Sequence, residues 1–210
     1  MELEMINAAI VALMKYPAVA TFSPQFLKRQ QYFEHAAMES QVYVPMVAQY
    51  GFEDGLFFEA VENRVKVELH RVTFPEQGLP SEAEHIHRLV ALAKPLFSDA
   101  DYMVPFAVGL NYQFQALDVH TLQALLPQPI QQYELRQIVL SRSDGQRTFN
   151  YNLGLGNPTE TGDLPVFVEA NVHIPVPEDA THALDSAITS MHAMLEEVRR
   201  ELTAFNPQVN

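Results

Sequence analysis

Strict alternation of apolar and polar residues marks four segments of the chain as β-strands. These segments are 63–72, 104–116, 149–155 and 166–174. In the first of them Val65, Val67 and Leu69 share one face, and charged residues or histidine occupy the other. Because successive side chains of a strand point to opposite faces, the pattern predicts strands with one buried and one wet face.

Two Asp-Gly pairs lie where tight turns would join such strands. Asp54-Gly55 separates the run 41–50 from the run 56–72. Asp144-Gly145 separates 131–142 from 147–156. Asp-Gly favours the positive φ angles of short hairpin turns, so both pairs predict antiparallel hairpins. The chain as a whole then favours a large, mostly antiparallel sheet of about seven strands.

Helical patterns are fewer. Ser81 and Glu84 have the spacing of a capping box, and the apolar residues after them predict a helix that Pro95 interrupts. A weaker helix is expected over 24–38, and a short turn over 118–126. The last helix carries an apolar stripe at spacings of four and three, formed by Leu184, Ile188, Met191, Leu195, Val198, Leu202 and Phe205.

The predicted fold class is therefore α+β, with the sheet packed against a long C-terminal amphipathic helix and one or two shorter helices. No Gly/Ser-rich or charge-rich linker divides the chain, which favours a single domain over 1–210. The alternative is two intimately packed pseudo-repeat halves, about 1–117 and 118–210, because each half contains an Asp-Gly hairpin followed by a helix.

Composition narrows the function classes. The 210 residues include 26 acidic and 13 basic side chains, a formal net charge of −13. That balance opposes binding to nucleic acid or to anionic membranes, both of which require Lys and Arg. The absence of cysteine excludes disulfides, thiol nucleophiles and cysteine-ligated metals. The acidic start of the chain and the lack of about 20 consecutive apolar residues favour a cytoplasmic location.

Motifs for catalysis, metals and cofactors are not found. His85 and His87 are two positions apart on a helix and do not face each other, so we expect both at the surface and predict no metal site. The Gly-x-Gly of 154–156 lacks a third glycine and a following helix, so we predict no nucleotide cofactor. No Gly-x-Ser-x-Gly elbow occurs, and no catalytic residue is assigned.

One strand face is the candidate binding surface. Phe167, Glu169 and His173 lie on the face of the 166–174 strand opposite its valines. Phe167 is either a cross-strand contact on a wet sheet face or the floor of an apolar groove.

Three functions stay open. The first is a non-catalytic binding or interaction protein (adaptor, chaperone-like or regulatory), acting with a protein partner or as a homo-oligomer. The second is a carrier of a small apolar ligand, with its cavity between the sheet and the C-terminal helix. In architecture alone the chain resembles helix-grip proteins, which enclose apolar ligands, and acidic, sheet-rich export chaperones. The third is an enzyme that uses His173, His182 and Asp185.

Overall fold

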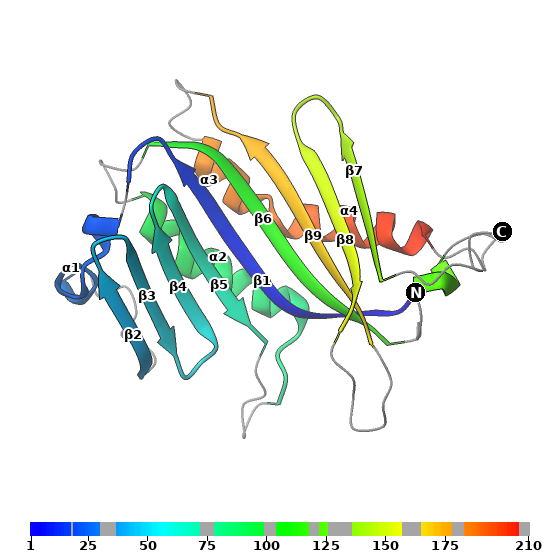
Figure 1. Cartoon of the computed structure of the whole chain (residues 1–210), viewed down its shortest axis with the longest axis horizontal. Helices are drawn as coiled ribbons and strands as arrows, with labels where there is room; N and C mark the ends of the chain where they lie inside the picture. The colour runs from blue at the N-terminus through cyan, green and yellow to red at the C-terminus, as the bar shows by residue number, and fades with distance from the viewer. Residues whose placement is uncertain are drawn as a thin grey trace.

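The computed structural model describes residues 1–17, 19–29, 37–71, 78–98, 104–117, 122–125, 136–156, 165–177 and 183–205. Its strands form one antiparallel sheet in the order β2-β3-β4-β5-β1-β6-β9-β8-β7 (Figure 1). The strands are β1 Leu3–Met14, β2 Met38–Val44, β3 Val47–Phe52, β4 Leu56–Val61, β5 Arg64–His70, β6 Pro105–Ala116, β7 Gln137–Ser143, β8 Thr148–Leu155 and β9 Val166–Pro175. The helices are α1 Pro24–Arg29, α2 Glu82–Ser98, α3 Ala183–Thr189 and α4 Met191–Ala204, with 3₁₀ turns η1 Val19–Phe22 and η2 Leu122–Leu125.

The α+β class and the large antiparallel sheet are confirmed, and the sheet has nine strands where about seven were expected. Both Asp-Gly hairpins are confirmed, with φ of 83° at Gly55 and 89° at Gly145. Two further turns divide runs that we expected to be continuous. Pro45-Met46 separates β2 from β3, and Glu62-Asn63 separates β4 from β5, with Glu62 at a φ of 49°.

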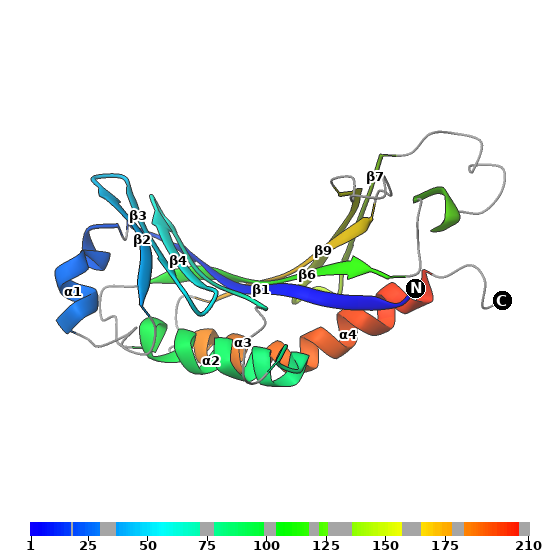
Figure 2. The same cartoon turned by 90° about the horizontal axis from the view of Figure 1, so that it is seen from below.

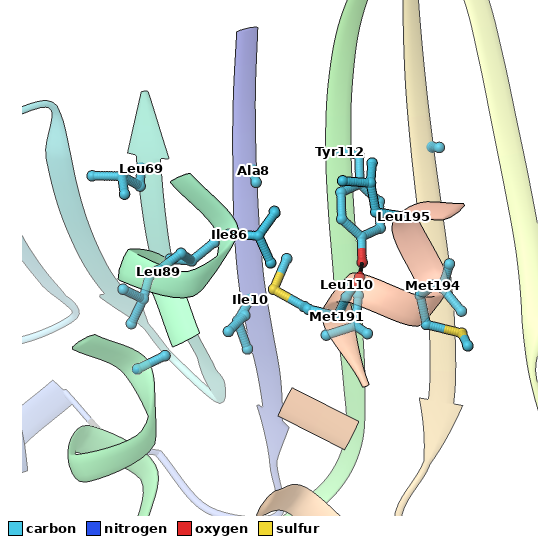
Figure 3. Packing of buried hydrophobic residues seen from close by; sticks show 14 of the residues in the cluster. Ala8, Ile10, Leu69, Ile86, Leu89, Leu110, Tyr112, Met191, Met194 and Leu195 are labelled. Carbon is cyan, nitrogen blue, oxygen red and sulfur yellow. Dashed lines mark hydrogen bonds between the residues drawn. The ribbon is translucent and has the colours of Figure 1, made fainter. Parts of the chain in front are cut away.

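The sheet and the helices form two layers. Helices α2, α3 and α4 cover one face, and both edges of the sheet bend away from them, so the opposite face is concave (Figure 2). Ile86 and Leu89 of α2 and Met191 of α4 meet Ile10 and Leu110 of the central strands between the layers (Figure 3). One side of the sheet therefore forms the core, and none of the described α-helices covers the concave side.

The C-terminal helix packs along the sheet, as its apolar stripe predicts, but it is two helices. It is interrupted at Ser190, whose hydroxyl donates to the carbonyl oxygen of Ala187 at 2.7 Å. A serine hydroxyl that bonds to the preceding turn competes with the regular helical ladder. The stripe itself is buried at Ile188, Met191 and Leu195, so α3 and α4 cover the core of their own chain.

Helix α2 begins as the sequence predicts but extends further than expected. The capping box of α2 is confirmed: the N–H of Ser81 donates to the Glu84 carboxylate at 2.9 Å, and the N–H of Glu84 donates to the Ser81 hydroxyl at 3.3 Å. Pro95 does not interrupt this helix, because Leu96 and Phe97 beyond it are buried in the core.

Helix α1 begins at Pro24 as predicted, and β2 already starts at Met38, so the helix does not fill 24–38. Residues 30–36 lie outside the described part of the chain. Of the turn expected over 118–126, only η2 is described.

The chain order of the strands is similar on the two sides of the central β1–β6 pair, although four strands lie beyond β1 and three lie beyond β6. Each half begins with a central strand, β1 or β6, and ends with the strand beside it, β5 or β9, followed by a helix. A division at residue 117 would leave β6 in the first half, whereas the repeated order starts at β6. The single domain over 1–210 stays a prediction.

Among the described residues, no helix is long and apolar enough to cross a membrane.

Candidate functional site on the concave sheet face

An irregularity in β1 decides which of its side chains reach the concave face. Met5 pairs with Phe114 and Asn7 with Gln113, so Ile6 is an extra residue in the ladder. Such a β-bulge shifts the alternation of side chains by one position. Without it, Asn7 would follow Met5 onto the helix side; with it, Asn7 and Ala9 lie on the concave face.

Polar side chains cross the concave face in a continuous row, one from each of six adjacent strands. From β5 to β7 the row runs through Glu68, Asn7, Gln113, Glu169, Asn152 and Gln137. We call this set the polar row. At its start, the Asn7 amide donates to the Glu68 carboxylate and, at 3.2 Å, to the side-chain oxygen of Gln113.

The second part of the polar row is held in the same way. The Gln113 amide donates to Glu169 at 3.2 Å, and the Asn152 amide donates to the other oxygen of Glu169 at 3.3 Å. The Gln137 amide donates to the side-chain oxygen of Asn152 at 2.6 Å. Because Gln113 and Asn152 each donate one hydrogen bond and accept another, they link the row without alternating opposite charges.

Three asparagines, here called the asparagine triplet, lie beside the polar row on β6, β9 and β8. They are Asn111, Asn171 and Asn150, which are direct neighbours across the strands. The Asn171 amide donates to the Asn111 side-chain oxygen at 2.6 Å, and the Ser141 hydroxyl donates to the Asn150 oxygen at 2.8 Å. No partner among the described residues engages the amides of Asn111 and Asn150 or the side-chain oxygen of Asn171.

The polar row, apart from Gln137, and the asparagine triplet line an open pocket of about 270 Å³. Ala9 lies next to Asn111 on the neighbouring strand, and its short side chain leaves the depression open. Val139 of β7 and Lys66 of β5 also line the pocket. This volume is slightly below the usual range for drug-sized ligands, so it suits a small molecule or one group of a larger one.

Glu68 is a carboxylate in this pocket. Its burial alone would raise its pKa, but hydrogen bonds from Lys66, at 2.6 Å, and from Asn7 outweigh burial and lower the pKa. The Lys66 ammonium also lies 5.1 Å from the centre of the Phe57 ring. Lys66 therefore compensates Glu68, whereas the partners of Glu169 among the described residues are the amides of Gln113 and Asn152.

Asn7 has a hydrogen-bonding deficit. Asn7 is 3% exposed, and its side-chain oxygen is buried without a partner among the described residues. A buried acceptor without a hydrogen bond costs about 1–3 kcal/mol. This oxygen itself is buried, so a ligand in the pocket could reach it only if Asn7 moved.

The candidate residues from the sequence lie on the concave face but are not all in the pocket. Glu169 belongs to the polar row and lines the pocket. Phe167 lies across from Gln115 and Gly154, towards the start of β9, and its ring fills the space that a Cβ at Gly156 would need. His173 is at the other end of the strand, and the binding role of the three residues stays a prediction.

The enzyme hypothesis finds no convergence of its residues. His173 alternates with the buried Val172 and thus faces the concave side, whereas Asp185 of α3 forms an ion pair with Lys94 of α2 at 3.1 Å. The sheet therefore lies between His173 and Asp185. His182 is outside the described residues. Within the described ranges, no group of three or more His, Asp or Glu residues is placed to hold a metal ion.

Our prediction that His85 is exposed was wrong. It is 2% exposed, and its Nε2 lies 2.8 Å from the carbonyl oxygen of Leu69 on β5. Burial lowers its pKa to about 4, and the positive charges of Arg71 and Arg88 add to the effect. His87, two positions further along α2, is exposed as expected.

The apolar-carrier hypothesis requires space between the sheet and the C-terminal helix. At the centre of that region Tyr112 is fully buried, and its hydroxyl donates to the carbonyl oxygen of Met191 at 2.7 Å (Figure 3). Leu110 and Leu195 are buried beside it. The packing of these side chains does not favour a ligand cavity at this place.

Only a weak sequence signal indicated the residues that line the pocket. Asn111, Asn150 and Asn171 stand at the polar positions of clean strands, which by themselves indicate only a wet face. Asn7 is the single polar residue in the apolar run 6–14, and this isolation was the available signal. Its placement depends on the bulge at Ile6, which alternation did not predict.

Comparison with known proteins adds no relative. The sequence matches no protein-family model, and a search of curated proteins finds no significant match.

Proposed function

We propose that this protein is a non-catalytic binding protein that holds a neutral, polar ligand in the pocket of the concave sheet face. The observation that carries the proposal is the set of unused hydrogen-bonding groups around the pocket. Among the described residues they are the amides of Asn111 and Asn150 and the side-chain oxygen of Asn171. Ligand sites of this kind combine a preformed hollow with a few well-placed polar groups.

The character of these groups supports a neutral ligand. Two are donors and one is an acceptor, and none carries a charge. The charged side chains nearby are already engaged, since Lys66 bonds to Glu68 and Glu169 accepts from two amides. An anion would meet Glu169 and a chain of net charge −13. A molecule with several hydroxyl or amide groups matches the unused donors and acceptors.

Preorganisation supports the same proposal. The hydrogen bonds of the polar row hold Gln113 and Asn152 in place before any ligand arrives. A site whose side chains are already ordered loses less conformational entropy on binding. No nucleophile with an adjacent base is found among the pocket-lining residues, which favours binding over catalysis.

The experiment is a nuclear magnetic resonance titration of ¹⁵N-labelled protein that follows the side-chain amide signals of Asn and Gln. The neutral probes are monosaccharides and N-acetyl amino acid amides. Their charged counterparts are sugar phosphates for the first set and free amino acids for the second. We expect saturable shifts of the Asn111, Asn150 and Asn171 signals with at least one neutral probe. The phosphorylated counterpart should bind more weakly.

Two variants make the result specific. Asn171→Leu removes the central acceptor and should abolish the saturable shifts. Gln49→Leu is the matched control, because Gln49 lies on β3, outside the pocket, and its amide donates to Glu59 at 2.8 Å. The proposal fails if no neutral probe binds, or if Asn171→Leu binds as tightly as Gln49→Leu and the unmodified protein.

A further inference from the structure

The pocket on the concave face is long and shallow, and we call it the trough. Its lining residues come from six adjacent strands, from Lys66 of β5 to Val139 of β7. Neighbouring strands lie about 4.8 Å apart, so the trough extends over roughly 24 Å along the curved sheet. A volume of about 270 Å³ is small for that length. A compact molecule would therefore occupy only part of the trough.

Three consecutive strands of the trough, β6, β9 and β8, repeat one arrangement of groups. One wall carries the asparagine triplet, and the other wall carries members of the polar row, two residues away on the same strand. These members are Gln113, Glu169 and Asn152. Between the walls lies the backbone of Tyr112, Ala170 and Tyr151, whose side chains are buried on the helix side. The same unit thus recurs once for every strand spacing.

The hydrogen-bonding groups left over in this repeat alternate in kind. Along the triplet, the groups without a described partner are the Asn111 amide, the Asn171 side-chain oxygen and the Asn150 amide, in the order donor, acceptor, donor. On the opposite wall each oxygen of Glu169 accepts one amide bond, at 3.2 Å and 3.3 Å. A carboxylate has about four acceptor sites, so Glu169 can also accept from a ligand hydroxyl. Bonds to a charged acceptor are stronger than bonds between neutral groups.

We propose that the ligand is a linear, neutral oligosaccharide that lies in the trough across the strands, with one sugar unit over each of β6, β9 and β8. This inference rests on the proposed function, because it names the chemical class of the ligand at the same site. A site that repeats matches a ligand that repeats at a similar length. One hexose unit of an extended chain is about as long as the strand spacing of about 4.8 Å. Sugar hydroxyls both donate and accept, as the alternation of free groups requires.

Other chain molecules fit the repeat less well. An extended peptide places the side chains of one face about 6.8 Å apart, which differs from the strand spacing. A nucleic acid is opposed by Glu169 and by the net charge of −13. A lipid chain would cover the polar groups of both walls without bonding to them, which costs free energy.

The test extends the nuclear magnetic resonance titration to neutral sugars of increasing length, with the whole chain. The probes are the mono-, di- and trisaccharides of glucose, mannose and N-acetylglucosamine, each series with the extended linkage of cellulose. Maltotriose is the matched control, because it joins the same glucose units as cellotriose in a linkage that curves the chain. In at least one series, each added unit should raise the association constant about fivefold, since each unit adds about one net hydrogen bond.

A variant at one end of the repeat tests the placement of the sugar units. Asn150→Ala removes the donor on β8 and should lower the trisaccharide affinity about fivefold, to that of the disaccharide. A monosaccharide can still bind over β9 or β6, so its affinity should fall less. Thr148→Ala is the matched control, because Thr148 lies on the same strand face as Asn150 but outside the trough.

The outcomes separate this inference from the proposed function. If no trisaccharide binds more tightly than its own monosaccharide, while monosaccharide binding still requires Asn171, the oligosaccharide is overturned and the proposed function stands. If no neutral probe binds at all, both are overturned. The oligosaccharide is also overturned if maltotriose binds as tightly as the best extended trisaccharide, or if an N-acetylated tripeptide amide binds more tightly than every trisaccharide. Equal affinities of Asn150→Ala and Thr148→Ala for the trisaccharide would overturn it as well.

Discussion

The buried His85 makes the stability of this protein depend on pH in a way that a single substitution isolates. The perturbation is His85→Gln, which keeps a side-chain amide donor near the Leu69 carbonyl oxygen but removes the titration. In the folded protein the pKa of His85 is about 4, whereas in the unfolded chain the ordinary value of about 6.5 applies. The unfolded chain therefore binds a proton at a higher pH than the folded protein does.

The sign and size follow from this difference. Above pH 6.5 the imidazole is neutral in both states and has no linkage effect. As the pH falls from 6.5 to 4, the unfolded state is stabilised by protonation and the free energy of unfolding decreases. Each pKa unit is about 1.4 kcal/mol. The shift from 6.5 to about 4 therefore lowers the free energy of unfolding by about 3 kcal/mol once the pH has fallen to the folded pKa.

The assay is urea unfolding followed by circular dichroism at pH 7, 6, 5 and 4. The free energy of unfolding of the unmodified protein, minus that of His85→Gln, should fall by about 3 kcal/mol over this range. His87→Gln is the control, because His87 is exposed on the same helix, and its curve should run parallel to that of the unmodified protein. Carboxylates titrate alike in all three proteins and cancel in the differences. If the His85→Gln curve is also parallel, the buried neutral imidazole is refuted.

Three further predictions concern contacts that hold the layers and one turn together. Tyr112→Phe should lower the free energy of unfolding by about 1 kcal/mol in urea, because it removes the hydrogen bond to the Met191 carbonyl; an unchanged value would contradict a role for this bond. Glu82→Gln should cost about 2 kcal/mol by the same assay, since the Glu82 carboxylate accepts from the Met5 N–H at 2.9 Å and pairs with Arg199; Glu84→Gln at the exposed cap is its control. The Asp144 carboxyl should titrate with a pKa of about 2 in a carbon-detected titration, because the N–H groups of Arg147 and Gln146 stabilise its charged form. Asp144 then stabilises the fold above its ordinary pKa, and that contribution disappears as the pH falls towards 2. A titration midpoint of Asp144 near pH 4 would show that the turn does not form these bonds.

The strands that could be read from the sequence were those with an uninterrupted period of two. The alternation over 63–72 and 166–174 corresponds to β5 and β9, and both Asp-Gly turns formed as expected. The two missed turns, Pro45-Met46 and Glu62-Asn63, contain no glycine. Glu62 takes a positive φ, which residues other than glycine rarely adopt. Neighbouring strands enforce these turns, so local propensity did not reveal them.

The helices, too, could be predicted from the sequence only in part. The apolar stripe determined that the C-terminal segment packs on the sheet, and the capping box determined where α2 begins. Pro95 was expected to interrupt α2, but the burial of Leu96 and Phe97 outweighs the lost hydrogen bond. His85 was read as exposed because the sequence does not show which helix face meets β5.

For the candidate site, the sequence by itself determined that Glu169 and the asparagines stand on wet strand faces, since this requires only alternation. It did not determine that β5, β1, β6, β9, β8 and β7 are neighbours in this order, because pairing between distant strands depends on the whole sheet. Only the tertiary structure decided that the bulge at Ile6 turns Asn7 to the concave face. The curvature that makes that face a pocket also belongs to the assembled sheet, because it arises from the twist of all its strands together.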